Sequence, residues 1–261
     1  MTDLRNLTAA IVSGLLSLTA VPSLAADNLT IGYSKVAKPD AAFQAFLQSF
    51  RANITAKNPD YVTIETQFSP ASVGFTRGLD PLQAWHKLKP FNQDMLTEAA
   101  NILVEQGDLP EGSKAPDYRP DALQAIARLI AKGVTFGTMA EVPGSICAPA
   151  NYKFSPKKIL AFATAHDNDA YALRFYNSAS SLFETPEENA KLVGNIRAFT
   201  PFVVIYDADV PTGWGRVATA NGLEGYLKDD SREQLGLSQQ HVCFGKVDGT
   251  YKVTALFGYG L

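Results

Sequence analysis

The sequence predicts an α+β fold built from a mainly helical N-terminal region, a small antiparallel β-barrel and a C-terminal β-hairpin. Apolar residues recur at helical spacing in the first half of the chain. Short apolar runs separated by proline, glycine and asparagine follow over residues 182–227, which is typical of short strands joined by tight turns. Near the end, Asp248-Gly249 divides two further strand-forming runs, the pattern of a hairpin.

Residues 1–25 differ in composition from the rest of the chain. A short polar start precedes an apolar run over residues 7–20, and small residues stand at Ser23 and Ala25. This is the pattern of a secretory signal peptide, so we expect cleavage before Ala26 and export of the remainder. A membrane anchor is the alternative, but the apolar run is well short of the ~20 residues that span a bilayer. We therefore expect no stable membrane anchor after cleavage.

The charge of the chain argues against one class of partner. The 23 basic and 26 acidic residues give a formal net charge of -3. Binding to nucleic acid depends on a basic face that neutralises phosphates, so nucleic acid is not an expected partner.

The two cysteines, Cys147 and Cys243, are expected to form a disulfide. An even number of cysteines in an exported protein is most simply explained by pairing. A reactive thiol is the alternative, but neither cysteine lies in a CxxC or Cys-His motif.

The N-terminal region covers residues 26–140. After an extended piece at 29–33, Pro39-Asp40 opens a helix with an aromatic stripe, for which packing against a core is favoured over a ligand site. A strand is predicted at 61–68. The other expected segments are a loop with Pro70, Gly74 and Gly78, and helices at 81–88, 92–106 and 121–132.

The second half divides into a linker, a barrel and a hairpin. Residues 141–168 begin with a stretch rich in proline and small residues and are taken as the linker. The barrel covers 169–230, starting with a strand at 170–176. The last part, 231–261, contains the predicted hairpin. Its two strands come in addition to those that the barrel requires. We expect the hairpin to complete a sheet on the N-terminal region.

A spaced pattern runs through the barrel region. Its most telling parts are Gly213-Trp214, Arg216-Val217 and Gly222-x-x-Gly225-Tyr226-Leu227. Over roughly 55 to 60 residues this pattern resembles the bacterial SH3-like domain, so the resemblance implies a small SH3-like β-barrel. Domains of that family commonly bind cell-wall peptides or target a hydrolase to its substrate. No hydrolase motif accompanies the domain here.

The flanks of the barrel sharpen this resemblance. Residues 146–150 precede the barrel, and residues 243–252 follow it with Gly249-Thr250-Tyr251 in place of the usual Gly-x-Trp. Together they look like a group of exported bacterial proteins that carry such a domain before a terminal hairpin. That group has no assigned activity, so the resemblance implies fold and compartment and leaves the ligand open.

The sequence offers little support for catalysis or a metal site. Cys147 lies among prolines, and His86, His166 and His241 share no motif, so no catalytic residue is predicted. The cluster at residues 166–169 is better explained as a solvated loop than as a weak calcium contact. We expect neither a cofactor nor a bound metal.

Aromatic residues of the barrel region are the predicted binding platform, because large rings with a polar tip suit a peptide or sugar surface. The alternative is that some of them are core and rim residues of a small barrel. Acidic residues at 184, 187 and 188 favour a cationic ligand, although a charged loop is usually a solvated face. The platform residues are Tyr171, Tyr176, Tyr206, Trp214 and Tyr226.

These observations predict a periplasmic or secreted, non-enzymatic binding protein. Its expected partner is a peptidoglycan peptide or another cell-envelope component. An envelope inhibitor or immunity-type factor that binds a protein is the alternative, and an unrecognised hydrolase that uses Cys147 is a third possibility. Because the hairpin and the cysteines clamp the barrel into a larger unit, the functional surface is also expected near the seam between barrel and N-terminal region.

Overall fold

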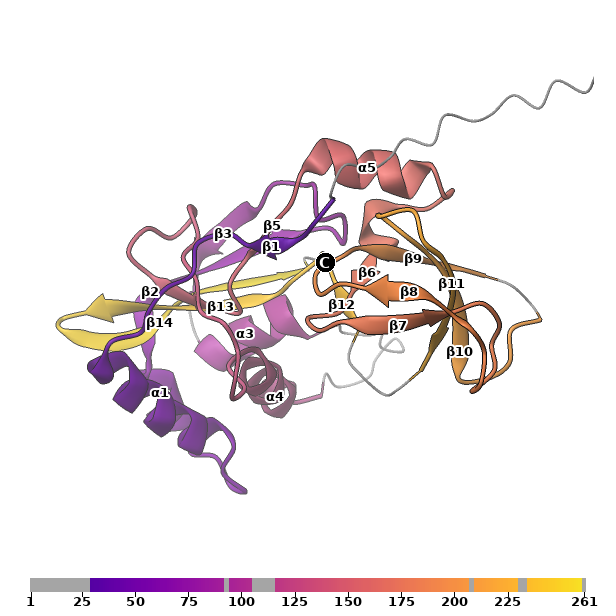
Figure 1. Cartoon of the computed structure of the whole chain (residues 1–261). Coiled ribbons are helices and arrows are strands. Elements are labelled where there is room, and N and C mark those ends of the chain that lie inside the picture. Colours follow the sequence, from indigo (N-terminus) through magenta and orange to yellow (C-terminus); the bar gives the residue numbers. More distant parts are fainter. Residues whose placement is uncertain (1–28, 92–93, 105–115, 207–208, 230–233, 260–261) are drawn as a thin grey trace, which may run out of the picture.

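The computed structural model describes residues 29–91, 94–104, 116–206, 209–229 and 234–259 (Figure 1). The predicted signal peptide lies outside the described residues. Within them the chain forms fourteen strands in three sheets and five short α-helices. The protein is therefore mostly β, and the prediction of a mainly helical N-terminal region is wrong. In the described part of the chain, no helix has the length and apolar character that a membrane crossing requires.

A five-stranded sheet forms the centre of the N-terminal lobe. Its order is β3 (His86–Pro90), β2 (Phe68–Arg77), β14 (Thr250–Tyr259), β13 (His241–Val247) and β4 (Ile146–Ala148). Strand β14 runs parallel to β2, whereas the other neighbours are antiparallel. The C-terminal hairpin thus completes a sheet on the N-terminal region, as the sequence predicts.

The turn between β13 and β14 has the conformation that its sequence predicts. Asp248 and Gly249 have φ values of 49° and 80°. Two consecutive residues in the left-handed region define a type I′ turn, whose twist matches that of the strands it joins.

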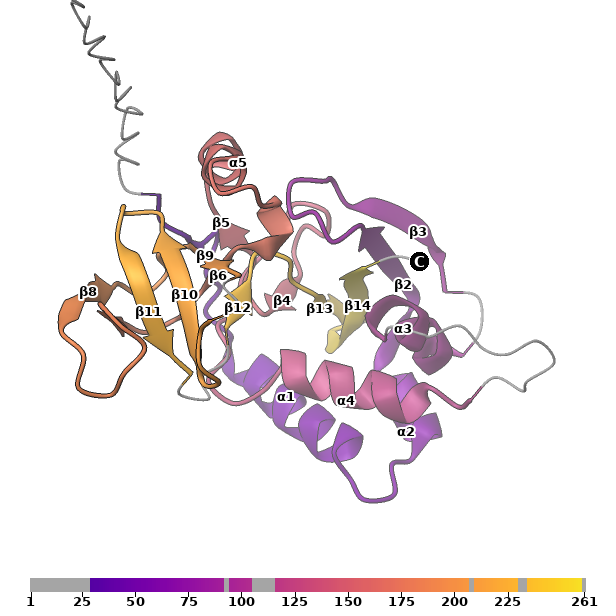
Figure 2. The same cartoon turned by 90° about the vertical axis from the view of Figure 1, so that its right-hand side faces the viewer.

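Four helices cover one face of this sheet. They are α1 (Ala41–Ile54), α2 (Tyr61–Thr66), α3 (Met95–Leu103) and α4 (Arg119–Leu129), of which α1, α2 and α4 lie together in Figure 2. The aromatic stripe of α1 packs on the hairpin, with the rings of Phe43 and Phe50 at 5.5 Å and 5.9 Å from that of Phe244. The stripe is therefore core, as expected.

Residues 61–90 differ most from the sequence prediction. The predicted strand at 61–68 is mainly the helix α2, because the Asp60 carboxylate accepts hydrogen bonds from the backbone N–H groups of Val62 and Thr63 and caps its start. The predicted loop that follows is the strand β2, which gains its hydrogen-bonding partner from the end of the chain. The predicted helix at 81–88 is wrong as well, since its end belongs to the edge strand β3.

A seven-stranded sheet occupies the region of the predicted barrel. The predicted apolar runs at 192–196, 202–206, 214–217 and 223–227 coincide closely with strands. Within the described residues, however, β8 (Leu192–Ile196) pairs only with β7 (Ser180–Phe183), and β12 (Leu235–Gly236) pairs only with β6 (Arg174–Phe175). The sheet is open, so the predicted closed barrel is wrong. Its order is β12 (Leu235–Gly236), β6 (Arg174–Phe175), β9 (Phe202–Ile205), β10 (Trp214–Thr219), β11 (Glu224–Lys228), β7 (Ser180–Phe183) and β8 (Leu192–Ile196).

The segment expected to be a linker carries regular structure. It contains β4, β5 (Tyr152–Lys153) and α5 (Pro156–Thr164), and a 3-10 turn η1 (Ala170–Ala172) follows. Strand β1 (Gly32–Tyr33) pairs with β5. Leu29 and Ile31 pack into a core that includes residues of β6, β9 and β10, and Val36 bridges to Gly137, which in turn pairs with Cys147 on β4. Residues near the start of the described chain are therefore linked to both larger sheets.

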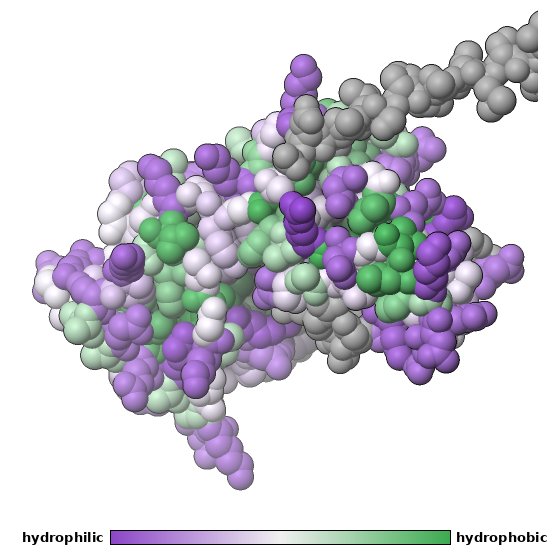
Figure 3. All heavy atoms as spheres, in the orientation of Figure 1, coloured by the Kyte–Doolittle hydropathy of each residue, from purple (hydrophilic) through white to green (hydrophobic). Residues whose placement is uncertain are grey.

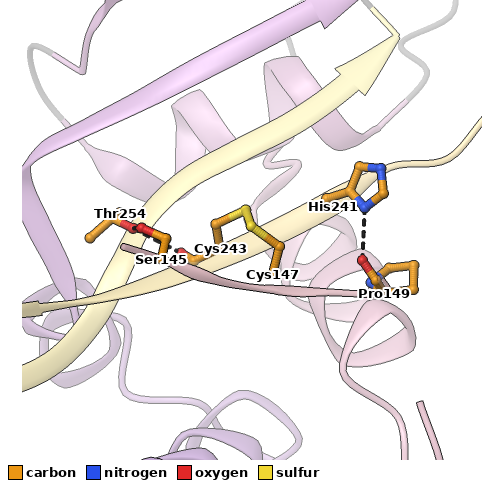
Figure 4. Close-up of a disulfide and its surroundings, with 6 residues drawn as sticks. All are labelled: Ser145, Cys147, Pro149, His241, Cys243 and Thr254. Atoms are coloured by element: carbon orange, nitrogen blue, oxygen red, sulfur yellow. Dashed lines mark hydrogen bonds between the residues drawn. A yellow bond between two sulfur atoms is a disulfide. The ribbon is translucent and has the colours of Figure 1, made fainter. Parts of the chain in front are cut away.

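The disulfide joins the two cysteines across adjacent strands (Figure 4). Cys147 on β4 lies opposite Cys243 on β13, and their Cα atoms are 4.0 Å apart. The backbone N–H and C=O of Cys147 bond to Gly137 instead, at 2.8 Å and 2.9 Å. The cysteines therefore occupy a non-hydrogen-bonded pair, where antiparallel strands approach most closely. This confirms the predicted pairing.

His241, two residues before Cys243, is fully buried beside the rings of Trp85 and Phe257. Its Nδ1–H donates to the carbonyl oxygen of Pro149 at 2.9 Å, because a carbonyl can only accept, and its Nε2 has no partner (Figure 4). Burial, with a smaller contribution from the Arg77 cation, lowers the pKa of His241 to about 4. The ring is therefore neutral near pH 7.

Replacing both cysteines, as Cys147→Ala with Cys243→Ala, removes a cross-link between positions 96 residues apart. We expect the free energy of unfolding in urea to fall by about 2 to 4 kcal/mol, since the unfolded chain regains loop entropy. Ser145→Ala is the control, because it removes only the nearby hydroxyl contact with Thr254. Two reactive thiols in the denatured, unreduced protein would contradict the pairing.

Acid should destabilise the fold through His241. Its pKa is about 4 when folded and near 6.5 when unfolded, so the unfolded state protonates first as the pH falls. The contribution of His241 to the free energy of unfolding is fully present above pH 6.5, and it decreases by about 3 kcal/mol as the pH falls to 4. His241→Asn retains a donor for Pro149 but cannot titrate, so it should lose this part of the pH dependence in urea unfolding.

One carboxyl group acts in the opposite direction in the same pH range. A hydrogen bond with Asp94, together with burial, raises the pKa of Glu65 to about 7. Protonated Glu65 therefore contributes to the free energy of unfolding below pH 4.5, and this contribution is lost as the pH rises through 7. The His241→Asn comparison should accordingly be made in a Glu65→Gln background. Equal pH slopes for the two proteins in that background would contradict the role of His241.

Candidate functional site

Three aromatic side chains gather on one face of the seven-stranded sheet, and we call this group the aromatic face: Phe183, Trp214 and Tyr226. Tyr226 on β11 lies directly opposite Phe183 on β7. Trp214 lies opposite Lys228, two residues beyond Tyr226, and therefore on the same face. The Trp214 ring meets Phe183 edge to face, with centroids 5.7 Å apart. All three side chains are half-buried.

The opposite face of the same strands is packed. Val217 and Leu227 alternate with the aromatic residues along β10 and β11 and are 1% and 4% exposed. They belong to a small core with Leu182, Ile196 and Phe202. Trp214 and Tyr226 are thus turned away from this core, which leaves their rings available for contact.

Ion pairs surround the aromatic face. Arg216 and Glu224 approach to 2.6 Å, Lys228 and Glu188 to 2.5 Å. The hydrogen bond from Lys228 lowers the pKa of Glu188. Glu184, another member of the predicted acidic loop, lies 3.7 Å from a lysine, Lys191. Two of the three loop carboxylates are thus paired within the protein, which weakens the hypothesis of a cationic ligand.

The other predicted platform residues lie elsewhere. Tyr176 is 3% exposed, its ring packs on Phe202, and its hydroxyl accepts a hydrogen bond from Gln234 at 3.3 Å. Tyr171 and Tyr206 are 46% and 94% exposed, and in the described part of the chain no aromatic ring contact involves either. The structure therefore brings together Trp214 and Tyr226 but not the remaining three.

Phe183 is the residue that sequence reasoning missed. It lies at the end of β7, within residues 182–186, which the sequence predicts to be the long first loop of the barrel. A strand of four residues offers too few alternations to be recognised. Only its pairing with β11 reveals that Phe183 faces Tyr226.

A second candidate region lies where the two lobes meet, near the seam named from the sequence. A cleft of about 500 Å³, which we call the seam cleft, separates the end of α4 from β12 and the segment that follows it. Figure 2 shows β12, the edge strand of the seven-stranded sheet, between the other strands of that sheet and the strands β4 and β13. The polar residues that line the cleft include Arg128, Lys132, Asn177, Gln234, Gln239 and Tyr259.

The described residues offer no assembled catalytic or metal site among the candidates weighed from the sequence. The sulfur of Cys147 is held in the disulfide and is not available as a thiolate. His166 packs against the Phe162 ring, with centroids 4.9 Å apart. Across the ranges that the structure describes, no three His, Cys, Asp or Glu side chains are grouped to hold a metal ion.

Comparison with models of known protein families gives no match, and comparison with curated proteins gives none either. The likeness to SH3-like domains therefore stays a prediction from the sequence pattern. Function has to be inferred from the two surfaces described above.

Proposed function

We propose that the protein is an exported, non-enzymatic binding protein that holds an extended peptide of the cell envelope against the aromatic face. The observation that carries this proposal is the clustering of three half-buried rings, Phe183, Trp214 and Tyr226, on the face of the sheet opposite the core of Val217 and Leu227. Aromatic rings provide a large contact area at a low cost in side-chain entropy, and the hydroxyl of Tyr226 adds a polar group.

The edge of the sheet beside the aromatic face favours a peptide over a sugar. Within the described residues β8 pairs on one side only, with β7. Its Leu192 and Val193 are 48% and 41% exposed, and Figure 3 shows apolar side chains gathered over this sheet and framed by hydrophilic ones. An open edge can pair with the backbone of an extended peptide, while alternate side chains of that peptide reach the adjoining face.

Two further observations support the envelope as the compartment and the source of the peptide. The signal-peptide pattern of residues 1–25 predicts export, and disulfides such as Cys147–Cys243 persist in oxidising compartments. Domains of the SH3-like family, which the barrel region resembles, commonly bind cell-wall peptides. A peptidoglycan peptide is therefore the first candidate ligand.

A protein partner is the second candidate, as expected for an envelope inhibitor or immunity-type factor. The observation that favours it is the same open edge of β8, because a strand of a folded protein can pair with it as readily as a free peptide can. The two candidates differ in whether isolated cell wall is sufficient for binding.

Binding to purified sacculi tests the proposal. We expect the wild-type protein to be retained, and Trp214→Ala with Tyr226→Ala to bind at least tenfold more weakly, since buried aromatic anchors commonly contribute ~2 kcal/mol or more. Tyr206→Ala is the matched control, because it removes a more exposed tyrosine outside the aromatic face.

Unfolding curves of each variant should be compared first, so that a loss of binding is not a loss of fold. Equal retention of the wild type and the double variant would contradict the proposal. If sacculi retain neither protein but the wild type captures one envelope protein in stoichiometric amount, the second candidate function is favoured.

A further inference from the structure

We infer that the seam cleft is a second binding site, separate from the aromatic face, for the carboxylate group of a small polar ligand. The inference rests on one buried amide whose hydrogen-bond donor faces the cleft, on two cations at its other wall, and on the way the end of α4 is capped.

The amide of Gln239 is oriented by the protein and offers a donor to the cleft. The residue is only 8% exposed, and its Oε1 accepts a hydrogen bond from the backbone N–H of Tyr152 at 3.1 Å. Because an N–H can only donate, this bond fixes Oε1 toward Tyr152 and leaves Nε2 on the other side. No acceptor of the described residues meets Nε2. The buried unpartnered side-chain atoms of the described part are Arg77 Nε and His241 Nε2 alone, so Nε2 of Gln239 reaches open space.

The neighbouring amides of this wall are also anchored. Nε2 of Gln240 donates to the Leu103 carbonyl at 2.9 Å, and Nε2 of Gln234 donates to the Tyr176 hydroxyl at 3.3 Å. Anchored side chains lose little further freedom when a ligand binds. Tyr176, which was predicted to contact ligand directly, instead supports the wall of the cleft.

The charges at the cleft favour an anion. Arg128 and Lys132, at the end of α4, line it, and none of the described lining residues is Asp or Glu. The C-terminal end of a helix normally repels anions, because its last carbonyl groups are unpaired and carry partial negative charge. Here Nε of Arg51 donates to the Ile130 carbonyl at 2.6 Å and its NH2 group to that of Ala131 at 3.2 Å. The helix end is therefore satisfied by another cation.

An amide N–H group on one wall and an arginine on the other match the two oxygens of a carboxylate. The volume of about 500 Å³ lies in the range of small-molecule sites. Such a carboxylate belongs either to the C-terminus of a short peptide or to a free small acid. The shared chemistry is the anionic, planar carboxylate.

Calorimetric titration of the full mature chain tests this inference with three probes: N-acetyl-dialanine, its C-terminal amide and glutarate. We expect N-acetyl-dialanine to bind and its amide to bind at least tenfold more weakly. Tighter binding of the peptide than of glutarate identifies a peptide C-terminus as the ligand class, and the reverse order identifies a free acid. The absence of binding by both carboxylate probes at millimolar concentration would overturn the inference.

Two variants locate the site. Gln239→Glu retains an acceptor for the Tyr152 N–H but replaces the donor with a negative oxygen, so binding should fall at least tenfold. Arg128→Gln, at an exposed position that preserves the fold, should weaken binding severalfold, whereas Lys157→Gln on α5 removes a remote cation and should leave it unchanged. Unaltered binding by both cleft variants would overturn the inference. Trp214→Ala should bind the probes normally, which distinguishes this site from the aromatic face.

Discussion

The parallel pairing of β14 with β2 is the interaction on which the rest of the structure depends. It joins residues 68–77 to the last described strand of the chain, and the Cys147–Cys243 bond fixes the other strand of the same hairpin to β4. Phe244, Val253 and Leu256 of the hairpin share one core with α1, α3 and α4. The N-terminal lobe therefore cannot form its core until the end of the chain is in place, which is a topology dominated by contacts distant in sequence.

The close approach of α3 to β14 shows how tightly this packing is specified. A Cβ atom built on Gly258 would lie 1.7 Å from the backbone oxygen of Ile102. Only a residue without a side chain permits this approach. The same hairpin buries His241 against Trp85 and Phe257, and this burial keeps the ring neutral near pH 7.

Local signals were sufficient for α1, α4 and the Asp248-Gly249 turn, because a helix stripe or an I′ turn is encoded within a few residues. They were not sufficient for β2, whose Pro70 and Gly74 resemble a loop until β14 supplies its partner. They also could not decide whether the seven-stranded sheet closes. Closure would require β8 to pair with the far edge of the sheet, and no local pattern encodes that.

The candidate sites likewise contain some residues that the local sequence identifies and others that only the folded structure identifies. Trp214 and Tyr226 could be found by residue type, because half-buried aromatic residues on short strands are common binding surfaces. Phe183 and Gln239 could not. The first acquires its role from a cross-strand neighbour on β11, and the second from a backbone N–H that lies 87 positions away.

Native-state hydrogen exchange of the backbone amides is the most direct test of a central hairpin. If β14 and β2 form the core of the N-terminal lobe, their slowest amides should exchange only through global unfolding, with the same free energy and denaturant dependence as the buried amides of α1. Exchange of β14 through a local opening of lower free energy, while α1 stays protected, would show that the lobe folds without the hairpin and would contradict its central place.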